Sequence, residues 1–176
     1  MARLATIDPA TATGPVKEIF DGPLKGKHLN IFKGMGNSPA ALNAYLGFSG
    51  ALAKGLLTKQ EQEVIHLALG QSRGCDYCLA AHTMIGKGAG LTDAQTIEAR
   101  RGSVCDKKLD AVVKLALALE EKRGHVSATD LANFKSVGYT DGHIAEVVAN
   151  HALATYTNYF NHLNETDIDL PAFPKI

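Results

Sequence analysis

The chain has 176 residues, which is enough for one domain whose core needs no disulfide support. Hydrophobic residues make up 45% of it and charged residues 20%, as in an ordinary globular protein. Its 18 Lys and Arg residues balance its 18 Asp and Glu residues, so bulk charge gives no reason to expect a nucleic acid or a membrane as a partner.

The N-terminal residues 1–37 predict an arm rather than a domain. They are rich in glycine and proline and contain one short helical candidate, Pro15 to Phe20. We expect this arm to lie over a neighbouring molecule. Ser38-Pro39 then supplies a helix N-cap with proline at the first helical position, and it begins a helical domain over residues 38–165.

Helix caps and apolar residues at helical spacing predict the remaining elements in chain order. The predicted helices cover residues 40–54, 59–71, 75–87, 93–101, 109–122, 128–137, and a last one that begins after Thr140. No stretch alternates as a strand does, so the fold class is all-α with seven or eight helices. Residues 166–176 contain Pro171 and Pro174 and should form an extended tail.

The three cysteines help to predict the compartment. The N-terminus lacks the basic and apolar runs of a signal peptide, and no apolar stretch reaches the roughly 18 residues that span a bilayer. Three cysteines, two of them at C-x-x-C spacing, do not make a secreted disulfide framework. We therefore expect a cytoplasmic protein.

Cys75, Cys78 and His82 stand at positions i, i+3 and i+7 of one predicted helix. This spacing lines them along a single face, each about one turn from the next. Helical side chains lean toward the N-terminus, so we expect the His82 imidazole to approach Cys78. Cys75 falls at the helix start, where unpaired N–H groups and the helix dipole favour a thiolate. The pattern predicts a catalytic dithiol that cycles through a disulfide.

Glu63 is the predicted acidic partner of this dithiol, and it lies on the preceding helix. If the break at Arg73-Gly74 folds the two helices into a hairpin, Glu63 can face His82 or the thiols and make the imidazole a better base. A carboxylate in such a place needs a hydrogen-bond partner. Glu61 has a structural explanation instead, because it completes a capping box with Thr58.

The residues alone leave other interpretations of the cysteine pair open. Cys75, Cys78 and His82 could supply three zinc ligands, although three ligands on one helix meet a tetrahedral geometry poorly. The cysteines could also be inert small hydrophobes, as is expected of Cys105 unless it lies in a polar loop. Redox chemistry is favoured, and we predict neither a metal nor a cofactor.

Other residues near the motif are candidates for a supporting role. His66 lies one turn after Glu63 and can hydrogen-bond to it. Tyr77, between the cysteines, either offers its hydroxyl to the site or packs, and packing is the favoured alternative. His151 and His162 are expected to be structural.

One internal repeat is visible in the sequence. Glu63-Val64-Ile65 lies twelve positions before the Cys75–Cys78 segment, and Glu146-Val147-Val148 lies twelve positions before Asn158-Tyr159-Phe160-Asn161. The second copy has asparagine where the first has cysteine. The repeat suggests two related helical hairpins, of which one carries the reactive groups.

Glu63, then eleven residues, the C-x-x-C pair, three residues and His82 together resemble the motif of the alkyl hydroperoxidase D (AhpD) group in the carboxymuconolactone decarboxylase family. The segment Gly74 to Thr83 is also typical of that group, and the resemblance extends from about Ser38 to Leu163. One position differs, because the founding peroxidase has histidine where this chain has Tyr77.

The resemblance implies an AhpD-like helical bundle that assembles as a trimer or a hexamer. It implies reduction of a hydroperoxide by Cys75 and Cys78, with Glu63 and His82 as a proton relay. Some members draw electrons from lipoylated proteins and pass them to a peroxiredoxin, so a dithiol reductant of this kind is the expected partner.

The function expected from sequence is therefore a thiol-dependent peroxidase in which Cys75 attacks the peroxide and Cys78 closes the disulfide. Three alternatives stand beside it. The same dithiol could reduce protein or small-molecule disulfides. A decarboxylase-type lyase could use Glu63 and His82 as acid and base with the cysteines incidental. The chain could also be a metal-binding module without turnover.

Overall fold

The computed structural model describes residues 2–176, and within them the chain forms helices and no strand. The all-α prediction is therefore confirmed. Nine helices lie within this range: α1 (Gly14–Asp21), α2 (Asn30–Met35), α3 (Pro39–Leu52), α4 (Lys59–Ser72), α5 (Asp76–Gly88), α6 (Asp93–Arg101), α7 (Lys107–Glu121), α8 (Ala128–Ser136) and α9 (Asp141–Asn164).

Helix α4 is the centre of the bundle and contacts α5, α6, α7 and α9. Thr58 caps it as predicted, because the Thr58 hydroxyl accepts the Glu61 N–H while the Glu61 carboxylate accepts the Thr58 N–H. All residues of α4 from Glu61 to Gly70 are buried. A helix enclosed on every side provides a rigid support for the side chains that it presents to its neighbours.

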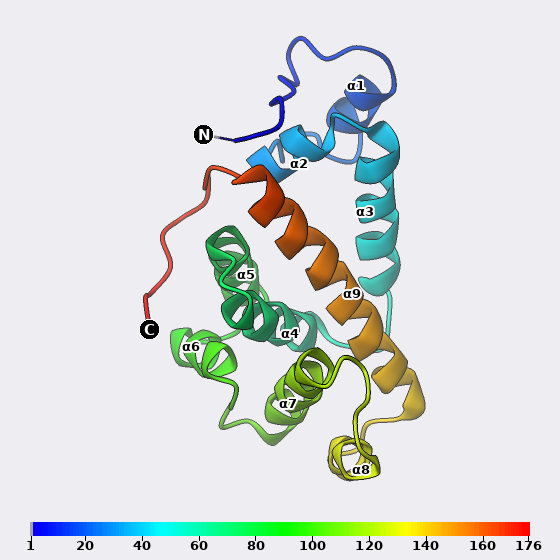
Figure 1. Cartoon of the computed structure of the whole chain (residues 1–176), viewed down its shortest axis with the longest axis vertical. Helices are drawn as coiled ribbons and strands as arrows, with labels where there is room; N and C mark the ends of the chain where they lie inside the picture. The colour runs from blue at the N-terminus through cyan, green and yellow to red at the C-terminus, as the bar shows by residue number, and fades with distance from the viewer. Residues whose placement is uncertain (1) are drawn as a thin grey trace.

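Helix α9 runs between α3 on one side and the α4–α5 pair on the other (Figure 1). The second copy of the internal repeat differs here from the predicted hairpin, because Glu146, Asn158 and Asn161 all lie on this one continuous helix of 24 residues. The first copy breaks at Gly74, whose φ is +66°. No glycine or proline interrupts residues 143–164, so nothing ends the helix between the corresponding positions.

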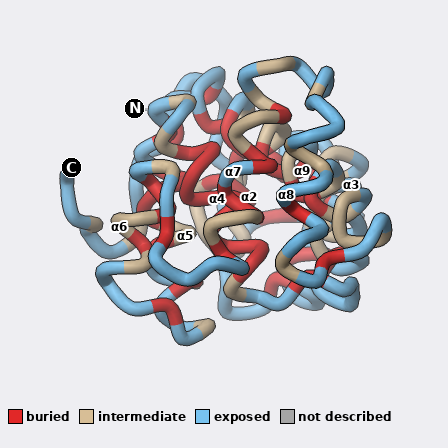
Figure 2. Tube along the Cα trace, turned by 90° about the horizontal axis from the view of Figure 1, so that it is seen from below, coloured by how far each residue is buried: buried red, intermediate tan, exposed pale blue. Residues whose placement is uncertain are grey.

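The residues of the N-terminal arm pack on the core of their own chain. Phe20, Leu24 and Phe32 are buried, and they form a core cluster that also contains Cys75 and Cys78. A larger cluster fills the space among α4, α7 and α9. The trace is buried through the centre of the molecule and exposed along its outer turns and tail (Figure 2).

The C-terminal tail has no regular secondary structure, as predicted, and it follows the outside of the bundle. Of the helices within residues 2–176, none combines the length and the apolarity that crossing a bilayer requires.

Candidate active site

The turn between α4 and α5 brings the two cysteines together. Gly74 adopts a left-handed conformation, and the Cys75 N–H donates to the Gly70 carbonyl at 2.9 Å. Cys75 then caps α5, and its sulfur accepts the Cys78 N–H at 3.3 Å. The two Cα atoms lie 5.3 Å apart and the sulfurs form a disulfide. The expected proximity of Cys75 and Cys78 is found.

Glu63 and His82 form a pair between α4 and α5, and His82 lies one helical turn after Cys78, as the hairpin prediction required. The Glu63 Oε2 lies 2.6 Å from His82 Nδ1, and Glu63 Oε1 lies 2.7 Å from the Lys59 Nζ. Glu63 is 1% exposed. Burial opposes its ionisation, but the charge and hydrogen bond of His82 and the nearby Lys59 outweigh burial and lower the pKa of Glu63 to about 2. The carboxylate is therefore charged at neutral pH.

His66 stacks on His82 and does not make the expected hydrogen bond to Glu63. The two imidazole centroids are 4.3 Å apart and the ring planes differ by 5°. Burial, followed by the charge of His82, lowers the pKa of His66 to about 3. His66 is thus a neutral ring that packs against the face of His82, and this contact helps to fix the orientation of the His82 imidazole.

Tyr77 connects the dithiol helix to both ends of the chain. Its hydroxyl accepts the Ile31 N–H at 3.3 Å and lies 2.9 Å from Asp169 Oδ1, to which it donates. Its ring is buried in the same cluster as the cysteines, and this burial raises the pKa of Tyr77. The hydroxyl is occupied by these two contacts, so the structure supports the packing alternative.

Two cavities adjoin the site from different sides. One, of about 280 Å³, is lined by Cys75, Tyr77, Asn161 and residues at the end of α9. The other, of about 60 Å³, lies on the Glu63 and His82 side and is lined largely by polar groups. Both cysteines are buried, at 1% and 2% exposure. Cys75 lines the larger cavity and Cys78 lines neither, so a small molecule would meet Cys75 first.

Two asparagines that the sequence analysis did not place in the site contact the dithiol. Asn158 Nδ2 lies 3.0 Å and Asn161 Nδ2 lies 3.4 Å from the Cys78 sulfur. Their correspondence to the cysteines in the internal repeat was visible in the sequence, but that signal does not say that the two copies meet. His82 makes no hydrogen bond to either sulfur among residues 2–176, although helix geometry predicts its approach to Cys78.

Two further candidate residues, Cys105 and His151, contact other partners than the dithiol. Cys105 is exposed in a loop and its thiol contacts Glu98 at 3.4 Å, so the polar-loop alternative is the one found. His151 contacts Glu120 at 2.7 Å in a cluster around Arg73. Across residues 2–176, no group of three or more His, Cys, Asp and Glu side chains is arranged to hold a metal ion.

The chain resembles several proteins of known structure. It superposes on an alkylhydroperoxidase AhpD core protein, an uncharacterised peroxidase-related protein from Ralstonia eutropha JMP134, with a TM-score of 0.84 and 20% identity over 96% of this chain and 92% of the other. A peroxidase-related protein from Silicibacter sp. TM1040 gives 0.79 and 17% over 94% and 89%. The debrominase Bmp8, as a cysteine-to-alanine variant in complex with 2,3,4-tribromopyrrole, gives 0.73 and 18% over 96% and 94%.

At these identities the structural matches establish the fold. Among proteins of curated function, none matches this sequence. The sequence profile of the carboxymuconolactone decarboxylase family matches residues 39–121, which span α3 to α7 and include Glu63, both cysteines of the pair and His82. Residues 39–121 therefore match the carboxymuconolactone decarboxylase family, and the chain as a whole has the fold of the AhpD core protein.

Proposed function

We propose that this protein is a thiol-dependent peroxidase that reduces small hydroperoxides with Cys75 and Cys78. The observation that carries the proposal is the buried cysteine pair, joined as a disulfide, one helical turn before an imidazole that is bonded to a charged carboxylate. The peroxidase-related structural relatives agree with this chemistry.

In the proposed reaction, the Glu63–His82 pair takes the proton of Cys78, and the Cys78 thiolate in turn takes the proton of Cys75. The Cys75 thiolate attacks one oxygen of the hydroperoxide and the O–O bond breaks. The departing alkoxide takes the proton held by the Glu63–His82 pair and leaves as the alcohol. Cys75 becomes a sulfenic acid, which condenses with Cys78 to a disulfide and releases water. A dithiol reductant then returns two electrons and two protons and becomes a disulfide itself.

The burial of both sulfurs favours a small substrate over a protein disulfide. To reduce a disulfide, the attacking thiolate must contact one sulfur of that disulfide directly. Cys75 is only 1% exposed, so a disulfide in a folded protein cannot reach it. The cavity beside Cys75, at about 280 Å³, is at the lower end of the volumes of small-molecule sites. Because Cys75 is reached through this cavity, the reductant should be a small or tethered dithiol, such as a lipoyl group. A peroxiredoxin is a second partner to test.

The proposal includes a homo-oligomer in the cytoplasm, as a trimer or a hexamer. Val148, Tyr159 and Leu163 are exposed at 47%, 60% and 59% and recur at helical spacing along α9. An apolar row of this kind on a surface helix is typical of a subunit contact.

Serine variants test the reaction directly. The reduced protein is mixed with an alkyl hydroperoxide and excess dithiol, and peroxide consumption is followed. We expect Cys75→Ser and Cys78→Ser to abolish turnover. Cys105→Ser is the matched control and should retain wild-type activity, since Cys105 is exposed in a distant loop.

The same assay separates the alternatives. If both serine variants keep full activity, the dithiol mechanism is wrong, and activity that survives complete alkylation of the thiols would favour the lyase. A faster rate with a small disulfide than with a hydroperoxide would make the protein a disulfide reductase. A debrominase shares the fold, so a bromopyrrole belongs in the substrate panel.

A further inference from the structure

Two amide groups from α9 contact the Cys78 sulfur. Asn158 is fully buried and Asn161 is 5% exposed. Both side chains direct an N–H donor at the sulfur, at 3.0 and 3.4 Å. In the internal repeat, these positions correspond to the two cysteines.

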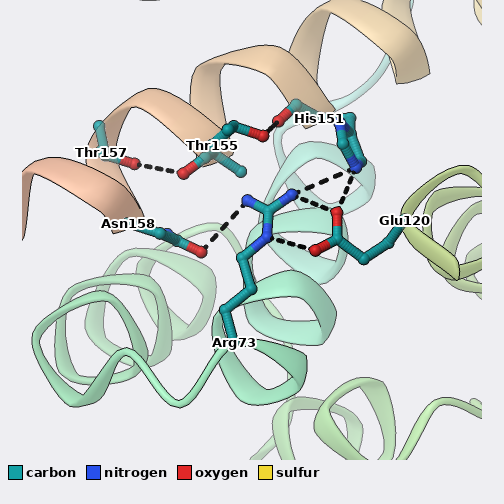
Figure 3. Close-up of polar contacts among 7 residues, drawn as sticks. Arg73, Glu120, His151, Thr155, Thr157 and Asn158 are labelled. Carbon is teal, nitrogen blue, oxygen red and sulfur yellow. Dashed lines mark hydrogen bonds and ion pairs between the residues drawn. The ribbon is translucent and has the colours of Figure 1, made fainter. Parts of the chain in front are cut away.

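Arg73 determines which end of the Asn158 amide faces the sulfur. The Arg73 Nη1 donates to the Asn158 Oδ1 at 3.4 Å (Figure 3). A guanidinium carries donors and no acceptor, so the amide oxygen must face Arg73. The amide NH₂ group is then directed toward Cys78, where a sulfur can accept its hydrogen bond.

Arg73 is itself held in place by an acidic partner. Its Nε and Nη2 donate to the two carboxylate oxygens of Glu120 at 2.8 and 2.5 Å, and His151 Nε2 lies 2.7 Å from the same carboxylate (Figure 3). Only 6% of the Arg73 side chain is exposed. The hydrogen bonds from Arg73 lower the pKa of Glu120 to about 2, so this carboxylate stays charged. A bidentate pair of this kind fixes the plane of the guanidinium.

Asn161 lacks such a constraint. Its Oδ1 is buried and has no hydrogen-bond partner within residues 2–176, and its donor is the more distant of the two. No charged group therefore sets the orientation of this amide. Asn158 is the donor whose direction the surrounding structure dictates.

We propose that Asn158 is a sulfur-binding residue of the dithiol site that stabilises Cys78 as a thiolate, and that Arg73 is the residue that positions it. The inference rests on the dithiol chemistry proposed above. A disulfide sulfur is a weak acceptor, whereas a thiolate carries a full negative charge, and hydrogen bonds to ionised acceptors are about twice as strong as neutral ones. The Asn158 contact therefore strengthens when the disulfide opens.

The role fits each step of the cycle. A dithiol reductant passes two electrons and two protons to the Cys75–Cys78 disulfide and becomes a disulfide. Cys78 then gives its proton to the Glu63–His82 pair, and Asn158 binds the thiolate that remains. Asn158 exchanges no proton itself, but its hydrogen bond favours the state in which Cys78 can deprotonate Cys75.

The test measures the dithiol couple without peroxide. The wild-type protein and its variants are equilibrated with mixtures of reduced and oxidised dithiothreitol, and the Cys78 thiol is titrated in a Cys75→Ser background. We expect Asn158→Leu to make the disulfide harder to reduce by about tenfold, or about 30 mV for two electrons, and to raise the Cys78 thiol pKa by about 1 unit. Asn158→Asp should have a larger effect, because it directs an anionic oxygen at the sulfur.

Variants of the neighbours separate sulfur binding from general packing. Arg73→Met should give a smaller shift in the same direction, and Arg73→Lys should restore part of it. Thr155→Val is the control on the same helix, and it should leave both quantities unchanged. Within residues 2–176 the Thr155 hydroxyl donates only to the His151 carbonyl. Thermal unfolding of each variant checks that it is folded.

The proposal is wrong if Asn158→Leu and Asn158→Asp both match Thr155→Val in potential and in thiol pKa. Arg73 orients the Asn158 amide but not the Asn161 amide. If Asn161→Leu and Asn158→Leu shift the potential and the thiol pKa equally, orientation by Arg73 has no effect and its positioning role is wrong. A wild-type protein that shows no peroxidase activity would refute the proposed function but not this inference, since neither measurement uses peroxide.

Discussion

At the scale of single residues, Glu63 is the side chain whose chemistry depends most on its surroundings. Burial alone would keep this carboxyl neutral. His82 and Lys59 lie within 2.6 and 2.7 Å of its two oxygens and keep it ionised instead. A fixed carboxylate holds the proton on His82 Nδ1, which leaves Nε2 as the nitrogen that can accept a proton from the thiol side.

The proposed proton relay makes a prediction about Glu63→Gln. A neutral amide orients the imidazole but does not stabilise its protonated form, so kcat/KM for hydroperoxide should fall about 100-fold. The control is Glu61→Gln on the same buried helix, where glutamine still completes the capping box, and it should retain activity. Steady-state peroxide consumption provides the measurement, and equal activity of the two variants would remove Glu63 from the mechanism.

His66 makes a prediction about stability and pH. Its pKa is about 3 when folded and 6.5 in the unfolded chain, so the unfolded state binds more protons between these values. The contribution of His66 to the free energy of unfolding is therefore fully present above pH 6.5. It is lost as the pH falls below that value, by up to about 1.4 kcal/mol per pH unit. The pKa of Glu63 is also lowered, but the stability that Glu63 contributes is lost only below pH 4.5.

Urea unfolding of His66→Gln between pH 6.5 and 5 isolates this contribution. The variant should show a flatter decline of unfolding free energy than the wild type over that interval, and His125→Gln, at an exposed position, should not. An unchanged slope for His66→Gln would mean that His66 is protonated in the folded state.

At the scale of elements, the α4–α5 turn decides whether Glu63 and the cysteines meet. Gly74 at φ +66° reverses the chain, and α5 then packs along α4. The short helix α2 depends on a distant contact instead. Its N-terminal Asn30 N–H donates to the Asp169 carboxylate at 2.7 Å, in place of a side chain at its own N-cap.

Two glycine variants test the turn. An added Cβ at Gly74 would meet no atom within 4 Å, so Gly74→Ala should cost only the strain of a left-handed backbone, about 1 kcal/mol of unfolding free energy. Gly50→Ala lies within α3, is equally unobstructed and has no positive φ, so it should stabilise by about 0.5 kcal/mol. Urea unfolding measures both, and a stabilising Gly74→Ala would contradict the assigned strain.

At the scale of the whole molecule, both ends of the chain enclose the dithiol. The arm residues share a core with the cysteines, and the tail is bound through Asp169 to Tyr77 and to the start of α2. The site is therefore formed by segments that are more than 90 positions apart in the sequence.

Tyr77→Phe tests this enclosure. The variant keeps the ring but loses the hydroxyl that joins Ile31 to Asp169, so Cys75 in the reduced protein should be alkylated several-fold faster. Tyr139→Phe is the matched control, because it loses a buried hydrogen bond to Glu61 away from the cysteines. If both variants react at the wild-type rate, the tail does not limit access to Cys75.

The sequence by itself determined the helices, their caps and the reactive motif, because capping boxes, apolar spacing and the C-x-x-C pattern are local. Thr58, Thr92 and Ser127 begin helices at the predicted positions for this reason. The Glu63–His82 pair followed from one predicted turn.

The tertiary structure alone decided which distant residues complete the site. Asn158 meets both Cys78 and Arg73 through the packing of α9 against α4 and α5, and the continuous course of α9 replaced the predicted second hairpin. The arm likewise packs on its own chain. Such contacts depend on how helices pack in three dimensions, which one helical period in the sequence does not specify.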